Sequence, residues 1–140
     1  MRNTPRPVVS VPRELPSGDS IVIAFDGSVH ASRALQAFLT TGLYRSKNVF
    51  VVSIDDDSQR AARHSALAIE FLQLHDVKAE ARPLESTGAV AEQLLAEVVA
   101  LETGLLVLGV HQKPTLQEMF RGSVTKTILN ESMVPLFLFH

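Results

Sequence analysis

Apolar and polar positions form two different patterns along this chain, and the order of these patterns predicts the secondary structure. Continuous apolar runs at 21–25, 49–54 and 105–108 are typical of strands that are buried on both faces. Between these runs, apolar residues recur at helical spacing over about 28–41, 58–75 and 88–102. The remaining predicted elements are a half-exposed strand at 77–82 with Pro83 near its end, a helix at about 123–132 and a last strand at 134–139.

Strands that alternate with helices predict βαβ units and a parallel sheet covered on both faces. We therefore expect a three-layer, Rossmann-like α/β fold with a five-stranded parallel sheet. The strand at 77–82 is only weakly apolar and suits a sheet edge, which favours the strand order 3-2-1-4-5, counted from 21–25. This order places the strands at 21–25 and 105–108 side by side where the winding reverses. Ligands bind open α/β sheets in that crevice, beyond the carboxyl ends of the strands.

Two loops are expected to border this crevice. Asp26-Gly27-Ser28 follows the first central strand, and Ser28 can cap the helix behind it. The second loop runs from Gly109 to Gly122-Ser123, at the start of the helix at 123–132. Glycines allow close backbone approach, and a helix N-terminus favours negative charge. The two loops together predict a site for an anionic ligand.

The N-terminal residues 1–19 are rich in proline and polar residues, and we expect them to form an extension to a domain at 20–140. Within them an apolar island, 8–11, lies between two prolines and predicts either a short edge strand or part of a flexible tail. Its sequence resembles the strand at 134–139, whose apolar edge would template aggregation if left bare. We expect that edge to be covered by the island, by a second copy of the chain, or by both.

The amino-acid composition of the chain argues against several classes of function. The chain has 140 residues, 46% hydrophobic and 20% charged, as in an ordinary globular domain. Its net charge of −2 gives no electrostatic case for nucleic acid or an anionic membrane, and no apolar run is long enough to span a bilayer. Without cysteine there is no disulfide, thiolate nucleophile or cysteine metal site, which is compatible with a reducing cytoplasm.

Catalytic chemistry has little support in the sequence. The five histidines are scattered and show no metal-ligand spacing, and His111 in the second loop is better read as a solvated side chain than as a base. Asp55-Asp56-Asp57 could hold magnesium, but a polar loop that caps the next helix is the favoured interpretation. We therefore expect no catalytic residue, no metal ligand and no enzyme.

Residues 20–140 resemble the universal stress protein family. The marks are a first strand that ends in Asp-Gly-Ser, a closing Val-Pro before an apolar strand, and the family's nucleotide loop. That loop reads Gly, two residues, Gly, nine residues, Gly, then Ser or Thr. The spacing from Gly109 to Gly122-Ser123 fits, but Gln112 stands where the second glycine is expected. The resemblance implies an adenine-nucleotide-hydrolase-like fold.

The resemblance also implies a ligand site. In members that bind ATP, the first-strand Asp lies near the ribose, the glycine loop and following Ser/Thr hold the phosphates, and backbone at the end of the second strand meets the adenine. By position, the implied residues are Asp26, Gly27, Ser28, Ser53, Ile54, Gly109, Gln112, Gly122, Ser123, Val124 and Thr125. The implied ligand is ATP or AMP, with magnesium as a companion ion. Gln112 adds a side chain where backbone should approach phosphate.

A second interpretation follows from the same family. Members that lack the glycines bind no nucleotide, so this chain could instead be a dimerising module that acts through protein contacts. In either case the resemblance implies a cytoplasmic stress-response regulator and a homodimer formed through the edge strand at 135–139. Some members are tandem proteins, and the junction between 6 and 28 resembles the start of a second half.

Overall fold

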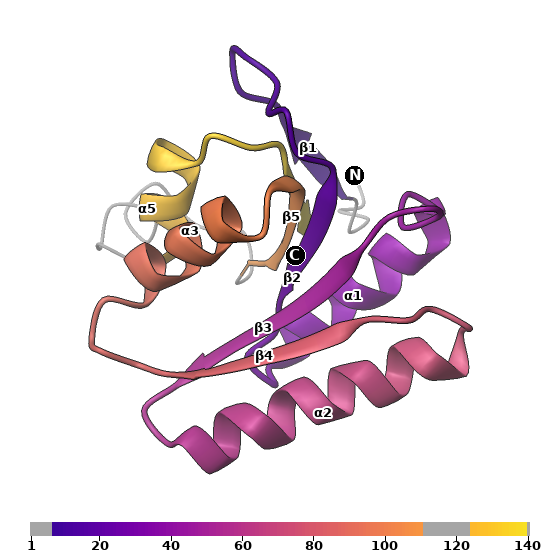
Figure 1. The fold of residues 1–140 in the computed structure, drawn as a ribbon, viewed down its shortest axis with the longest axis vertical. Coiled ribbons are helices and arrows are strands. Elements are labelled where there is room, and N and C mark those ends of the chain that lie inside the picture. Colours follow the sequence, from indigo (N-terminus) through magenta and orange to yellow (C-terminus); the bar gives the residue numbers. More distant parts are fainter. Residues whose placement is uncertain (1–6, 111–123, 140) are drawn as a thin grey trace, which may run out of the picture.

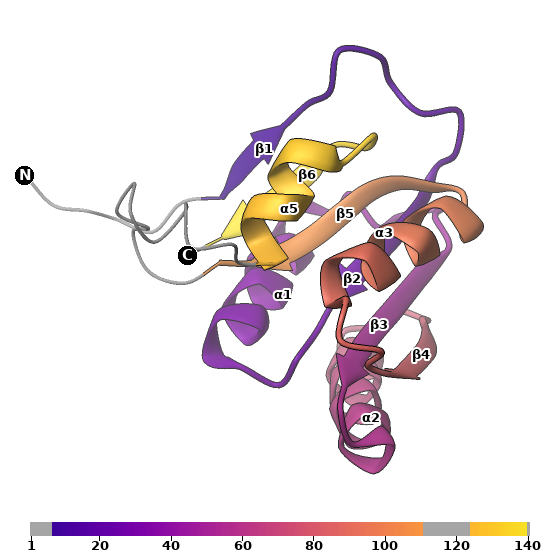
Figure 2. The same cartoon turned by 90° about the vertical axis from the view of Figure 1, so that its left-hand side faces the viewer.

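The computed structural model describes residues 7–110 and 124–139 (Figures 1 and 2). Strands and helices alternate along the chain from the second strand onward, as the apolar pattern predicts. In order, the described elements are β1 (Val8–Ser10), β2 (Ser20–Ala24), α1 (Val29–Thr41), β3 (Val49–Asp55), α2 (Ser58–Leu74), β4 (Glu80–Glu85), α3 (Val90–Ala100), β5 (Thr103–Gly109), α5 (Val124–Glu131) and β6 (Leu136–Phe139).

The sheet has six strands in the order β1-β6-β5-β2-β3-β4. The neighbours from β6 to β4 are parallel, so the predicted order 3-2-1-4-5 is confirmed as β4-β3-β2-β5-β6. The expectation of five parallel strands was incomplete, because β1 pairs antiparallel with β6 and makes the sheet mixed. β2 and β5 lie side by side in the middle, where the winding reverses.

β1 occupies the outer edge of β6. Val8, Val9 and Ser10 stand opposite Leu138, Phe137 and Leu136. Of the two covers expected for this edge, the N-terminal strand of the same chain is therefore present. β1 is short and exposed along its whole length, with Val8 and Val9 each 52% exposed.

Helices cover both faces of the sheet and form two cores. α1 and α2 lie on one face, and α3 and α5 lie on the other (Figure 1). Successive residues of β2 point to opposite faces, so Ile21 and Ile23 join the first core and Val22 joins the second. This double burial explains why the central strands read as continuous apolar runs.

The helix caps position the loops at the carboxyl end of the sheet. The hydroxyl of Ser28 accepts a hydrogen bond from the backbone N–H of Ala31 at 3.1 Å, and Gly42 ends α1 with a φ of 70°. The carboxylate of Asp57 accepts from the N–H groups of Gln59 and Arg60 and begins α2. The expected caps at Ser28, Gly42 and the aspartate loop are confirmed.

Several predicted boundaries differ from the structure by up to three residues, and two of the differences have a clear physical reason. The edge strand begins at Glu80 rather than at 77, because the backbone of Val77 still pairs with the last turn of α2: its N–H donates to the carbonyl of Leu72 at 2.9 Å, after Asp76 with a φ of 59°. Gly104 does not end α3, which stops at Ala100, but lies in β5.

Gly104 is explained by close packing instead. A Cβ there would lie 2.7 Å from the carbonyl oxygen of Gly18 and 2.8 Å from Cα of Asp19. The chain that leads from β1 into β2 therefore crosses β5 closely at this glycine. In the described part of the chain, no helix is both long and apolar enough to cross a membrane.

Candidate functional site

A cavity of about 360 Å³ opens at the carboxyl ends of β2, β3 and β5. Its position matches the crevice predicted from the strand order, and its volume is within the range of small-molecule sites. The residues that line it are Ala24, Phe25, Asp26, Ala31, Val52, Ile54, Val90, Leu94, Leu108, Gly109, Val124 and Thr125. They come from strands β2, β3 and β5, the loop after β2, and helices α1, α3 and α5.

The structure brings part of the predicted site together. Asp26, Ile54, Gly109, Val124 and Thr125 all line the cavity. Gly27 and Ser28 lie in the adjoining loop but do not line it, and Ser53 is buried behind it. The hydroxyl of Ser53 donates to the carbonyl of Phe25 at 2.6 Å, so its side chain joins the ends of β3 and β2. The remaining predicted residues, Gln112, Gly122 and Ser123, lie outside the described residues.

Most of the cavity wall was not predicted. Its apolar surface is contributed by Ala24, Phe25, Ala31, Val52, Val90, Leu94 and Leu108. The sequence offered a partial signal, because Val90 and Leu94 belong to the apolar stripe of α3 and the strand residues precede the predicted loops. Spacing assigns such residues to a core, however, and does not distinguish a core position from a cavity wall.

Asp26 is held at the rim of the cavity by a tight turn. Its Oδ1 atom accepts a hydrogen bond from the N–H of Ser28 at 2.9 Å, across Gly27 with a φ of 79°. Asp and Gly favour such turns, because an Asp side chain can accept from backbone two residues on and Gly adopts positive φ without strain. The turn fixes the carboxylate of Asp26 beside an apolar cavity, where it can accept hydrogen bonds from a ligand.

Gly109 ends β5 against the first turn of α1. A Cβ on Gly109 would collide with the carbonyl group of His30 and would lie 2.6 Å from the backbone nitrogen of Ala31. Only a residue without a side chain allows this approach. Gly109 therefore has a packing role in the scaffold, and it also lines the cavity.

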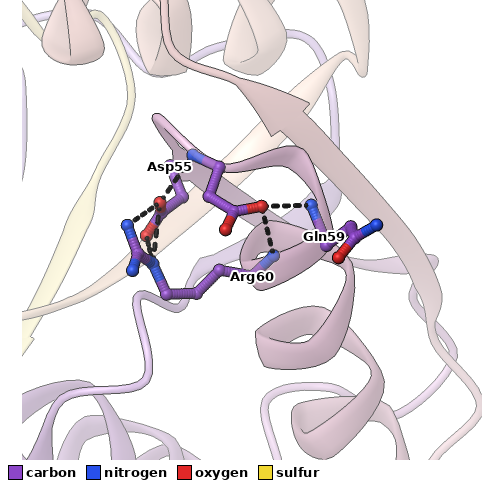
Figure 3. Close-up of polar contacts among 4 residues, drawn as sticks. Asp55, Gln59 and Arg60 are labelled. Carbon is purple, nitrogen blue, oxygen red and sulfur yellow. Dashed lines mark hydrogen bonds and ion pairs between the residues drawn. The ribbon is translucent and has the colours of Figure 1, made fainter.

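Asp55, at the end of β3, and Asp57 both make hydrogen bonds within the protein (Figure 3). The Nε atom of Arg60 donates to both carboxylate oxygens of Asp55 at 2.9 Å, and the N–H of Asp57 donates to Asp55 Oδ1 at 2.9 Å. These hydrogen bonds, the one from Arg60 foremost, lower the pKa of Asp55 to about 2. Asp57 acts as the α2 cap, as expected for this loop. Within 7–110 and 124–139, no group of three or more His, Asp or Glu side chains could hold a metal ion.

The model of the universal stress protein family matches residues 19–140. A universal stress protein of Synechocystis sp. is 23% identical over 141 residues; the match covers 99% of this chain and 48% of that protein. The chain thus spans about half the length of this curated relative.

Solved structures share the fold. A universal stress protein from Archaeoglobus fulgidus DSM 4304 matches with a TM-score of 0.73 at 18% identity, over 86% of this chain and 44% of that one. A universal stress protein in complex with cAMP matches with a TM-score of 0.72 at 15% identity, covering 89% and 98% of the two chains. An Arabidopsis thaliana family protein with AMP bound gives 0.63 at 13% identity, covering 86% and 90%. Since the family model covers most of its length, this chain belongs to the universal stress protein family.

Proposed function

We propose that this chain is a nucleotide-responsive stress protein whose cavity binds an adenine nucleotide. The observation that supports this most directly is the position of the cavity, at the carboxyl ends of β2 and β5 with the carboxylate of Asp26 at its rim. Apolar walls suit a base, and a carboxylate accepts hydrogen bonds from ribose hydroxyls. Two of the matched universal stress proteins hold cAMP or AMP.

The phosphates are assigned to the segment that begins at Gly109 and leads into α5. Backbone N–H groups near Gly122, Ser123 and the start of α5 would hold them, as at other helix N-termini. The ligand is ATP or AMP, and magnesium would accompany the triphosphate of ATP. We propose a regulator rather than an enzyme: the ligand would change the shape or the partner affinity of the protein in the cytoplasm, and any ATP hydrolysis would be slow and incidental.

Calorimetric titration of nucleotide-free protein with AMP, and with ATP and magnesium, tests this function. We expect binding near micromolar, at least tenfold weaker in Asp26→Ala, because the variant loses a charged hydrogen-bond acceptor. Glu70→Ala removes an exposed carboxylate on α2, away from the cavity lining, and should bind as the wild type does. An absence of heat with both ligands, together with no co-purified nucleotide, would overturn the proposal.

Two further variants examine the glycine loop. Gln112→Gly should tighten ATP binding, because it removes a side chain where backbone is expected to approach phosphate. Gly122→Asp should abolish binding, because it adds negative charge beside the phosphates. If both variants bind ATP with unchanged affinity, the glycine loop does not contact the ligand, even if the cavity binds the nucleoside.

We also propose a homodimer that uses the edge strand 135–139. The observation that favours it is the exposed apolar surface beside that edge, where Val8, Val9 and Val11 are each at least 52% exposed. A dimer that pairs 135–139 directly would have to displace β1 from β6, whereas a dimer that leaves β1 in place would extend the sheet from β1 instead. If nucleotide binding fails, dimerisation through this edge is the alternative function.

Light scattering at micromolar concentration should give twice the chain mass, and a clean monomer would refute the dimer. Val9→Asp separates the two arrangements. It should weaken a dimer that is built on β1, because a charge is then buried in the interface. The same change should strengthen a dimer that requires β1 to leave, because β1 then pairs less well with β6.

A further inference from the structure

His64 on α2 packs against the loop that carries Asp26. A Cβ placed on Gly27 would lie 2.6 Å from Nε2, 2.7 Å from Cδ2 and 2.9 Å from Cε1 of the His64 ring. Three atoms at the far edge of the imidazole therefore meet the same face of Gly27. The ring is only partly exposed. No motif pointed to His64, which is separated from Gly27 by a helix and a strand.

The position of His64 is itself fixed by the start of α2. Arg60 is one helical turn before His64 and lies on the same face of the helix. Its guanidinium pairs with Asp55 at 2.8 Å, and the Asp57 carboxylate caps the first turn (Figure 3). This anchors the first turn of α2 to the carboxyl end of β3. His64 is thus presented to Gly27 from a well-held helix end.

The Asp26 loop is held from three directions. Ser53 on β3 donates to the carbonyl of Phe25, just before Asp26. Ser28 caps α1, just after Gly27. His64 closes the third side, where Gly27 has no side chain of its own to fill the space. The two hydrogen bonds fix the ends of the turn, and the imidazole supports its middle.

We propose that His64 is a positioning residue that holds Gly27 and so directs the Asp26 carboxylate towards the ribose of the bound nucleotide. The inference rests on the proposed function and deepens it. His64 acts by packing, through Gly27, and does not touch the ligand. A residue that acts in this way should affect ligand affinity only while Asp26 is present.

A double-mutant cycle tests this dependence. AMP is titrated into the wild-type chain, His64→Ala, Asp26→Ala and the double variant. We expect His64→Ala to weaken AMP binding about tenfold and to have no further effect when Asp26 is already alanine. His64→Phe, which restores a flat ring of similar width, should recover affinity to within about twofold. If His64→Ala weakens AMP binding by the same factor with and without the Asp26 carboxylate, the inference is overturned.

His75→Ala is the matched control. It removes the histidine at the C-terminal cap of the same helix, where the ring contacts Phe71 and its Nδ1–H donates to the carbonyl of Phe71. We expect AMP affinity to be unchanged. An equal loss in His75→Ala would indicate general loosening of α2 and would count against a specific role for His64.

Amide hydrogen exchange supplies a readout that needs no ligand. The N–H of Ser28 donates to Asp26 Oδ1, so its exchange rate reports how firmly the turn is held. It should rise about tenfold in His64→Ala and return in His64→Phe. If the wild type binds no adenine nucleotide, the proposed function fails and the ribose part of this inference fails with it. Unchanged exchange in His64→Ala would overturn the positioning role whether or not nucleotide binds.

Discussion

The loop after β2 and the end of β5 each have a glycine near the cavity, but the two glycines are required for different reasons. Gly27 has a φ of 79° and faces a side chain, the ring of His64. Gly109 has no positive φ and faces the backbone of α1 at His30 and Ala31. The first glycine makes a turn and the second allows two elements to meet. A glycine at a ligand crevice can thus be required by the scaffold as well as by a ligand.

The largest effect is expected for Gly109→Ala. The new methyl group would meet backbone rather than a movable side chain, so α1 must shift away from the end of β5. We expect the free energy of unfolding to fall by about 3 kcal/mol or more. Urea unfolding measures it. Gly88→Ala is the control, because a Cβ there meets nothing within 4 Å and only its φ of 100° is strained. If the free energy of unfolding falls equally in the two variants, Gly109 is not required for packing.

A smaller effect is expected for Gly27→Ala. Positive φ costs about 1–2 kcal/mol for alanine, and the His64 ring must also move. Because the obstacle is a side chain, His64→Ala in the same chain should relieve part of the loss. The double variant should therefore be more stable than the sum of the two single losses predicts. Strict additivity in urea unfolding would show that His64 does not restrict Gly27.

The smallest effect is expected for the ion pair between Arg60 and Asp55, which anchors the first turn of α2. Hydrogen bonds from Arg60 and from the N–H of Asp57 lower the pKa of Asp55 from 3.8 to about 2. An unfolded chain regains the ordinary pKa, so this contribution to stability is complete above about pH 4. It is then lost as the pH falls through about 2.

Asp55→Asn should remove that part of the pH dependence. The midpoint of urea unfolding, followed between pH 5 and pH 2, should fall less steeply in this variant than in the wild type. Asp56→Asn makes the same charge change one residue away and should keep the wild-type slope. If Asp55→Asn keeps the full slope as well, the pair does not stabilise the start of α2.

The sequence predicted the structure correctly where a residue pattern occurs in only one kind of structural setting. Ile21, Val22 and Ile23 are all apolar because both faces of β2 are covered, and this pattern led directly to the strand order. Val77 and Gly104 gave wrong element boundaries, because each of these residue types occurs in more than one structural setting. A buried valine also occurs where a helix ends, and a glycine also occurs where chains cross. Hydrogen bonds and contacts between distant segments decide such cases.

The candidate site shows the same division. Asp26 and Gly109 could be predicted because the order of the strands brings their two strand ends together. Val90 and Leu94 could not, since an apolar helix stripe looks the same whether it fills a core or lines a cavity. His64 was also missed, because its contact with Gly27 depends on how α2 packs rather than on any local pattern.

The pairing of β1 with β6 has a consequence for the order of folding. Val8 pairs with Leu138, so β1 needs almost the whole described chain to be synthesised before it has this partner. Contacts between such distant residues form slowly, because a long loop must close before they are gained. The parallel pairs from β2 to β6 do not include β1. β1 is thus expected to join the sheet last although it precedes the other described strands in the sequence, and until then the apolar edge of β6 is open to other chains.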